Sequence, residues 1–391
     1  MKLSLIVAIN NDHRNIVEYL VEHGANVNEG LIGNTPLIIA TTKRDETLVK
    51  CLVEHGADVD KGGLIGHTPL MIAINNGDEN IVKCLVDNGA DVNKKWLGIT
   101  TYLMLAITKG YESIVTYLIE HGANVNEEQI GTTPLMTAIT NGLENIVKCL
   151  VEHGADVNKE YQLGITPLMT AVTNGFENIV ECLVEHGADI NKKCLLNGDT
   201  SLTMAIQNGS EAIVKYLLDH GADVNITNKY GLTSMMIAQA KLQQASTLSS
   251  EQRQKYQKII DYLISKGSKN TASQQSQNGS SGIAFGPKTQ NTASTANVRF
   301  SFGERIQDAS SSFHFGQQSQ NSSTASGGFT FGPQPQNASS SGTNPLQEQL
   351  FEAVKNENLD EINYAISNGA DVNALNNELI KETPFREFYH E

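Results

Sequence analysis

Apolar residues along most of the chain recur at helical spacing in pairs of short segments. In one such pair, Leu70 and Ile74 belong to the first segment, and Ile81 and Leu85 belong to the second. This spacing predicts two amphipathic helices, each with one buried face. The chain between Asn93 and Gly98 suits a short β-hairpin.

Cap residues mark the expected ends of these helices. Thr68 can cap the first helix through its hydroxyl, and Pro69 suits the first helical position. Gly77 and Gly89 follow the expected helix ends, where a left-handed residue is needed. Local signals therefore predict where each helix starts and stops.

Two markers repeat with one period of 32–34 residues. The glycine of His-Gly-Ala or a close variant falls at Gly24, Gly56, Gly89, Gly122, Gly154, Gly187 and Gly221. The threonine of Thr-Pro-Leu or a variant falls at Thr35, Thr68, Thr101, Thr133, Thr166, Thr200 and Thr233. One helix pair cannot bury its own apolar face, so we predict an α-solenoid stabilised by stacking.

The repeat resembles that of the ankyrin family, most clearly in Thr68-Pro69-Leu70 and Gly89-Ala90-Asp91-Val92-Asn93. The resemblance covers residues 1–267 and 345–391. It implies a β-hairpin and a helix-turn-helix in each unit, and a non-catalytic scaffold that binds a protein partner. We expect eight units in residues 1–267, the first and last atypical. The last carries a polar insertion, Gln243–Gln257, which with Lys258–Ser265 forms a modified cap.

Some units depart from the family pattern. Tyr102, Ser201 and Ser234 replace the marker proline, and Arg44-Asp45 replaces the glycine turn of the second repeat.

The hairpin tips carry apolar residues where the family usually has polar ones. These residues are Leu31, Ile32, Leu64, Ile65, Trp96, Leu97, Tyr161 with Leu163, Leu195, Leu196 and Tyr230. Stacked in register, they would form an exposed apolar stripe that binds a partner. The alternative is that they fold back against neighbouring tips. If the stripe exists, Trp96→Ala with Leu97→Ala should weaken binding and leave the melting temperature unchanged.

A second candidate surface lies at the ends of the first helices, which face the concave groove in the family. Its residues are polar and nearly uncharged, and include Asn75, Asn76, Thr108, Lys109, Thr140 and Asn141. The resemblance implies partner binding by hydrogen bonds in this groove.

Residues 268–343 differ in composition, being rich in Ser, Gln, Asn, Thr, Ala and Gly. Such a segment buries too little apolar surface to fold, so we predict a disordered linker. It holds seven phenylalanines, Phe285, Phe300, Phe302, Phe313, Phe315, Phe329 and Phe331. Six of them form three Phe-x-Phe-Gly motifs, and Phe285-Gly286 is a shortened fourth. These motifs resemble nucleoporin FG repeats and imply binding to nuclear transport receptors. A duplicated linker with incidental aromatics is the alternative.

The repeat pattern resumes in residues 344–391, an incomplete second ankyrin segment. Leu350–Asn373 matches Leu5–Asn28, and Thr383-Pro384-Phe385 follows. Either this segment docks onto the main array, or the chain ends early relative to a longer ancestor. We favour the second interpretation.

The 391-residue chain has a net charge of −15, which disfavours nucleic acid as a partner and favours a basic or neutral protein surface. We expect a monomer without membrane association, located in the cytoplasm or the nucleus. If the source is an intracellular bacterium, a host-directed effector is a further alternative. A localisation or nuclear-transport adaptor is the main alternative to the scaffold.

We expect neither an enzyme nor a cofactor or metal. The sequence has no phosphate-binding glycine loop, nucleophile elbow or C-x-x-C motif. Each recurring histidine or cysteine comes from a different repeat. Equivalent side chains in neighbouring repeats are therefore too far apart to share a zinc ion or to form a disulfide. We therefore predict packing and helix-end hydrogen bonds for them. Cys194, at a tip, is the one candidate for a reactive thiol.

Overall fold

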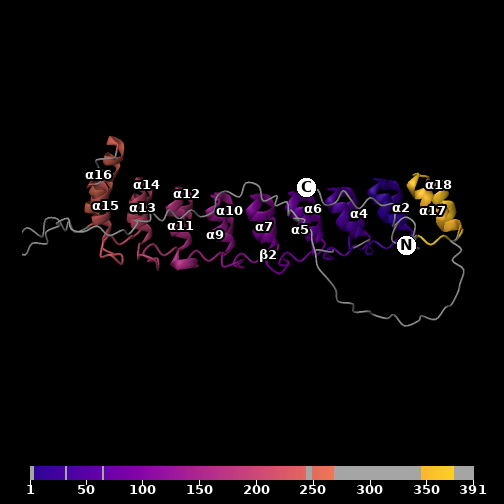
Figure 1. The fold of residues 1–391 in the computed structure, drawn as a ribbon, viewed down its shortest axis with the longest axis horizontal. Coiled ribbons are helices and arrows are strands. Elements are labelled where there is room, and N and C mark those ends of the chain that lie inside the picture. The colour runs from indigo at the N-terminus through magenta and orange to yellow at the C-terminus, as the bar shows by residue number, and fades with distance from the viewer. Residues whose placement is uncertain (1–3, 31–32, 64–65, 244–248, 268–344, 374–391) are drawn as a thin grey trace, which may run out of the picture. The chain divides into compact units, whose positions relative to one another are not determined.

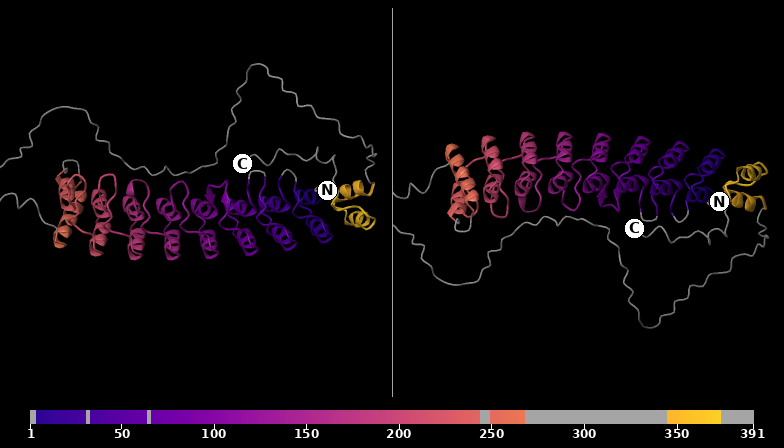
Figure 2. Two further views of the ribbon diagram at one scale, coloured as in Figure 1. Left: turned by 90° about the horizontal axis from the view of Figure 1, so that it is seen from below. Right: turned by 90° about the horizontal axis from the view of Figure 1, so that it is seen from above.

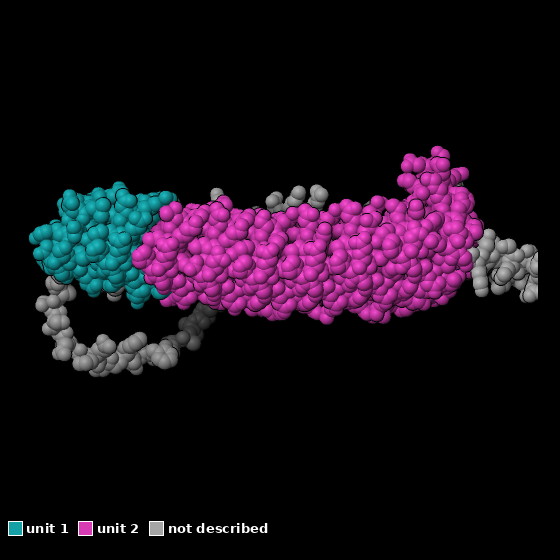
Figure 3. Space-filling view, turned by 180° about the vertical axis from the view of Figure 1, so that it is seen from behind, with its two compact units in different colours: residues 1–31, 294–391 teal, residues 32–293 magenta. Residues whose placement is uncertain are grey.

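The structure is a computed structural model that describes residues 4–30, 33–63, 66–243, 249–267 and 345–373. The chain forms two compact units, distinguished by colour in Figure 3. Unit 1 comprises residues 1–31 and 294–391, and unit 2 comprises residues 32–293. Most of the repeats therefore belong to unit 2.

The described residues of unit 2 form a stack of seven helix pairs (Figure 1). The first helices are α3 (Pro36–Thr42), α5 (Pro69–Asn76), α7 (Tyr102–Lys109), α9 (Pro134–Thr140), α11 (Pro167–Asn174), α13 (Ser201–Asn208) and α15 (Ser234–Gln243). The second helices are α4 (Glu46–Glu54), α6 (Glu79–Asp87), α8 (Glu112–Glu120), α10 (Glu144–Glu152), α12 (Glu177–Glu185), α14 (Glu211–Asp219) and α16 (Ser250–Ser265). Each first helix packs on the next first helix and each second helix on the next second helix, so unit 2 has two layers (Figure 2). The predicted α-solenoid is confirmed.

The helix ends follow the predicted local signals. The Thr68 hydroxyl accepts a hydrogen bond from the Met71 amide, and Pro69 begins α5. Gly77 ends α5 with φ of 74°, and Gly89 follows α6 with φ of 90°. These are left-handed conformations that glycine adopts without a Cβ penalty.

At two positions that depart from the repeat pattern, the substituted side chain contacts the neighbouring repeat. Tyr102 begins α7 where other repeats have proline, and its buried hydroxyl lies 2.6 Å from the Thr68 hydroxyl of the preceding repeat. Arg44 takes the left-handed turn position with φ of 58°, and its guanidinium pairs with Asp78. Both substitutions therefore join one repeat to its neighbour.

A ladder of asparagines connects consecutive repeats of unit 2. The Asn93 side chain donates to the Gly122 carbonyl at 2.9 Å and accepts from the Asn124 amide at 2.8 Å. The same pair of bonds recurs at three later positions, Asn126, Asn158 and Asn191. Each asparagine thus satisfies one carbonyl and one amide of the next repeat.

The last helix pair of unit 2 is extended by part of the predicted polar insertion. Helix α16 has 16 residues, whereas the other second helices of unit 2 have nine. Ser249 and Gln252 form a capping box at its start, which satisfies two backbone amides. The insertion therefore lengthens the second helix at its amino end.

Unit 1 brings together segments from opposite ends of the chain. It contains α1 (Ser4–Asn10) and α2 (Arg14–Glu22), and also α17 (Pro345–Lys355) and α18 (Leu359–Ser367). Helix α17 packs against α1 as well as against α18. Of the two alternatives considered for the C-terminal segment, residues 345–373 therefore adopt the docked one in this structure.

Candidate functional site

The hairpin tips of unit 2 have tight turns with unusual backbone conformations. Strands β1 (Lys95–Trp96) and β2 (Thr100–Thr101) form an antiparallel hairpin, and the next tip is closed by a bridge between Gln129 and Thr132. At three successive tips an apolar residue with positive φ precedes the tip glycine. The pairs are Leu97-Gly98, Ile130-Gly131 and Leu163-Gly164.

A left-handed conformation is unfavourable for a residue with a bulky side chain. It costs about 1–2 kcal/mol for L-residues other than glycine, and asparagine and aspartate tolerate it best. The φ angles here are 50° for Leu97, 50° for Ile130 and 61° for Leu163. Backbone strain of this kind is concentrated at functional sites, because elsewhere a tolerant residue suffices.

Several predicted tip residues are exposed. The exposed fraction is 62% for Leu97, 61% for Leu195 and 74% for Tyr230, and Leu196 is also exposed. Ile130 is 82% exposed, yet it was not among the predicted residues. Its position directly before a tip glycine, equivalent to that of Leu97, is the signal that could have found it.

Other tip residues contact the neighbouring tip. The Trp96 ring lies 5.4 Å from the His67 ring, measured between centroids, and Trp96 is half-buried. The Leu195 amide donates to the Leu163 carbonyl at 2.7 Å. A Cβ placed on Gly164 would lie 2.7 Å from Leu195 Cγ, so Leu195 packs over this glycine. The tips therefore combine outward-pointing residues with residues that fold back.

Tyr161 is half-buried within its own tip, where its amide donates to the Ile165 carbonyl. Four predicted tip residues, Leu31, Ile32, Leu64 and Ile65, lie outside the described residues.

The predicted groove residues are less available for hydrogen bonding than their polarity suggests. Thr108 donates its hydroxyl hydrogen to the Met104 carbonyl, and Thr140 donates to the Met136 carbonyl, both at 2.8 Å. These bonds lie within one helix, so the hydroxyl oxygens remain as acceptors only. Four other residues complete the predicted set, of which Asn75, Lys109 and Asn141 are exposed and Asn76 is partly buried.

Tip and groove residues meet in a cavity of about 260 Å³ near the end of unit 2. Tyr230 and Leu232 line it from a tip, while Gln207 of α13 and Lys241 of α15 line it from the first helices. Asp199, whose side chain is buried, also lines the cavity. This cavity is therefore lined by apolar and polar side chains, including Lys241, around one buried carboxylate.

Amides hold the Asp199 carboxylate in place. Asn228 donates to Oδ1 at 2.9 Å, while Asn197 and Gln207 donate to Oδ2 at 2.6 and 3.0 Å. The same network binds Cys194, whose thiol donates to Asn197 Oδ1 at 2.7 Å. Cys194, the one candidate for a reactive thiol, is only 3% exposed and is therefore not accessible at the surface. It packs in a cluster with Ile165 and Met169.

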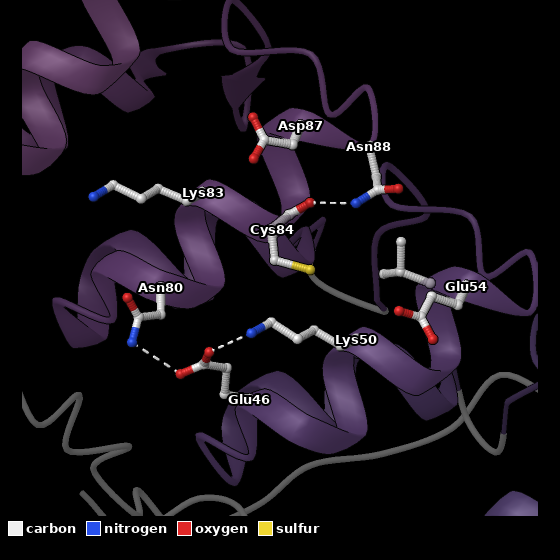
Figure 4. Close-up of a pocket in the computed structure, with 9 residues that line it drawn as sticks. Glu46, Lys50, Glu54, Asn80, Lys83, Cys84, Asp87 and Asn88 are labelled. Atoms are coloured by element: carbon white, nitrogen blue, oxygen red, sulfur yellow. Dashed lines mark hydrogen bonds and ion pairs between the residues drawn. The ribbon is translucent and has the colours of Figure 1, made fainter.

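A second hollow of about 380 Å³ lies between α4 and α6 (Figure 4). The ammonium of Lys50 lies 2.6 Å from Glu46, and this bond holds the pKa of the carboxyl below its usual value. Asn80 donates to the same carboxylate at 2.9 Å. Burial raises the pKa of the Cys84 thiol. The hollow is therefore lined by an internally paired polar network and a protonated thiol.

The recurring histidines occupy helix ends, as predicted. At each of six second-helix ends the histidine Nδ1 lies 2.8 Å from the carbonyl four residues earlier; these are His23, His55, His121, His153, His186 and His220. The five cysteines are free thiols. Within the described ranges, no group of three or more His, Cys, Asp or Glu side chains is arranged to hold a metal ion.

None of the helices formed by the described residues is long and apolar enough to cross a membrane.

The stacked helix pairs and their hairpin tips define a helical-repeat protein of the kind that presents an extended surface. The family model for ankyrin repeats in three copies matches residues 3–63, 59–129, 103–194, 158–228 and 192–274. These matches cover more than half of the chain, so the chain belongs to the ankyrin-repeat family. Ankyrin repeats are in general protein–protein interaction modules and typically non-enzymatic.

Two solved structures are similar to part of this chain. The ankyrin repeat domain of human ASB11 is 24% identical, with a TM-score of 0.45, and the match covers 60% of this chain and 98% of that domain. The ankyrin repeat domain of Bcl-3, a member of the IkappaB family, is 26% identical with a TM-score of 0.49. That match covers 60% of this chain and 100% of the Bcl-3 domain. No curated protein sequence matches the chain.

Proposed function

We propose that this protein is a non-catalytic scaffold that binds a protein partner through the hairpin tips and adjoining groove of unit 2. The supporting observation is the row of exposed apolar residues with positive φ, Leu97, Ile130 and Leu163. Each of these residues has an exposed apolar side chain and a strained backbone conformation. A partner that buries them recovers roughly 1.5–3 kcal/mol for each fully buried side chain.

The charge and shape of the last tips indicate the chemistry of the partner. The cavity beside Tyr230 and Leu232 is lined by both apolar and polar side chains, among them Lys241 and the buried Asp199 carboxylate. The net charge of the whole chain is −15. A partner with apolar side chains bordered by lysine or arginine fits the exposed apolar tips and this net charge, because opposite charges speed encounter and set the register.

Affinity capture with the full chain tests this proposal. A triple variant with Leu97→Asn, Ile130→Asn and Leu163→Asn should lose the partners that the wild-type chain retains. Its thermal unfolding should stay unchanged or move upward, since asparagine tolerates positive φ. The control is Ile264→Asn, which removes an exposed isoleucine from α16, away from the tips. Equal capture by the wild-type chain and the triple variant would contradict the proposal.

The transport-adaptor alternative depends on the Phe-x-Phe-Gly motifs, which lie outside the described residues. It is tested in the full chain by replacing the paired phenylalanines with serine. An import receptor should bind the wild-type chain and not the variant if the motifs are functional. The substituted residues are Phe300, Phe302, Phe313, Phe315, Phe329 and Phe331.

A reducing compartment, the cytoplasm or the nucleus, suits the scaffold role, because all five cysteines are free thiols. We expect the scaffold to act as a monomer.

A further inference from the structure

The C-terminal helix pair meets the first repeat through the hydrogen bonds that join consecutive repeats in unit 2. The Asn373 side chain donates to the Gly24 carbonyl at 2.8 Å and accepts from the Asn26 amide at 2.8 Å. Asn93 makes the equivalent bonds to Gly122 and Asn124 at 2.9 and 2.8 Å. Residues 345–373 thus occupy the position of a repeat that precedes the first one.

Side chains of the helices add further contacts. The Tyr19 hydroxyl of α2 donates to Asn363 Oδ1 of α18 at 2.9 Å. The His13 Nδ1 lies 3.1 Å from the Val354 carbonyl at the end of α17. Leu350 and Val354 of α17 are fully buried, and α17 packs on both α1 and α18. The pairing therefore has an apolar centre with hydrogen bonds at three separate points.

The two faces of the C-terminal pair differ in polarity. Leu350, Val354 and Ile362 are buried, whereas Glu348, Glu352 and Glu361 are exposed. Repeat arrays need a terminal unit with a polar outer face, because the end of an inner repeat is apolar. In α1, Leu5, Ile6 and Ile9 are buried. The C-terminal pair packs on α1 and carries exposed carboxylates on its own surface.

We infer that the amino-terminal side of the first repeat is a binding site for an ankyrin repeat, and that its ligand is residues 345–373 of the same chain. The ligand acts as a terminal cap that binds non-covalently and reversibly. Residues Asn373 and Gly24 are 349 positions apart, so no short connection enforces the contact. The 77 residues 268–344 tether the ligand to its site, which favours binding within one chain over binding between copies in dilute solution.

A nicked full-length chain tests this inference. A protease site is inserted within residues 268–344, a fluorophore is attached at the C-terminus, and the purified chain is cut. We expect the C-terminal fragment to co-elute with the remainder at about 10 µM, which corresponds to micromolar or tighter affinity. Fluorescence anisotropy on dilution then gives the dissociation constant.

Two variants probe the two sides of the contact. Asn373→Ala removes both ladder bonds from the ligand, and we expect binding at least about tenfold weaker. Tyr19→Phe removes the hydroxyl that reaches Asn363 from the receptor side, with a smaller loss expected. Both residues are partly exposed, so neither change should prevent folding of the helices.

The control is Asn158→Ala, which removes the same two bonds between covalently consecutive repeats of unit 2. It should leave the fragment affinity within about twofold of wild type, since additivity holds for distant sites. The inference is overturned if the wild-type fragment separates even at about 100 µM, a concentration far above the expected dissociation constant. It is also overturned if the uncut chain is a dimer whose copies exchange this segment, because the ligand would then come from a second copy.

Discussion

Replacing Ile130 by asparagine should stabilise the protein, although it removes an apolar side chain. Ile130 and Gly131 form the two-residue loop between Gln129 and Thr132, whose backbones exchange hydrogen bonds of 2.8 and 3.0 Å. Both loop residues have positive φ, 50° and 74°. A turn of this type favours Asn-Gly, and Ile130→Asn creates that pair.

The expected gain follows from two opposing terms. Relief of the left-handed strain on a β-branched residue is worth about 1–2 kcal/mol. Ile130 is 82% exposed, so less than a fifth of its side chain is buried. Removing that buried part costs about 0.3–0.6 kcal/mol of unfolding free energy. The net change in unfolding free energy is therefore an increase of about 0.5–1.5 kcal/mol.

Urea unfolding monitored by circular dichroism measures this change. The urea concentrations at the transition midpoints of wild type and variant are compared with one shared value for the denaturant slope m. The matched control is Ile165→Asn in the next tip, where the isoleucine is 8% exposed and clusters with Met169 and Cys194. That control should lose about 2–5 kcal/mol, because it removes a buried side chain and buries an amide. A clear loss of stability in Ile130→Asn would refute the strain argument.

Three further predictions concern individual contacts. Gly77→Ala should destabilise more than Gly175→Ala in thermal unfolding, by about 1 kcal/mol or more, because both glycines have φ near 75° but only at Gly77 would a Cβ lie 2.9 Å from the Tyr111 ring. Burial and the Asp87 hydrogen bond raise the pKa of Tyr117 to about 12, so its contribution to stability should be complete below the unfolded pKa near 10 and be lost as pH rises towards 12; ultraviolet titration of wild type and Tyr117→Phe checks this. Burial raises the pKa of the Cys84 thiol, as it does for Cys149 and Cys182, so a disulfide reagent at pH 8 should modify them more slowly than a free thiol. Equal rates would show that these thiols are more accessible than the structure indicates.

Local sequence determined the helices and their ends. Thr68, Pro69 and Gly77 act on backbone groups no more than four residues away, so their roles could be predicted without any knowledge of packing. The 33-residue period then required stacking, because one helix pair leaves an apolar face uncovered. The lengthened helix α16 was expected as a modified last unit, although not as extra helical turns.

The candidate site was predicted less completely, because exposure at a tip depends on the next tip. Trp96 packs on His67, whereas Leu97, the next residue, is exposed. Trp96 and Leu97 are both apolar, so hydrophobicity alone could not distinguish them. Because Trp96 packs on His67, the double substitution of Trp96 and Leu97 should lower stability as well as binding. Ile130 was missed although it precedes Gly131 as Leu97 precedes Gly98; only the strain in its φ angle required the structure.

The sequence by itself determined the repeat, the family and the position of each cap, because these depend on contacts within a few residues or on a fixed period. The tertiary structure alone decided that Cys194 is buried against Ile165 and Met169 and that residues 345–373 lie against the first repeat. Both facts depend on surfaces brought together by stacking. The ladder that Asn373 makes with Gly24 and Asn26 spans almost the whole chain, and no local pattern specifies it.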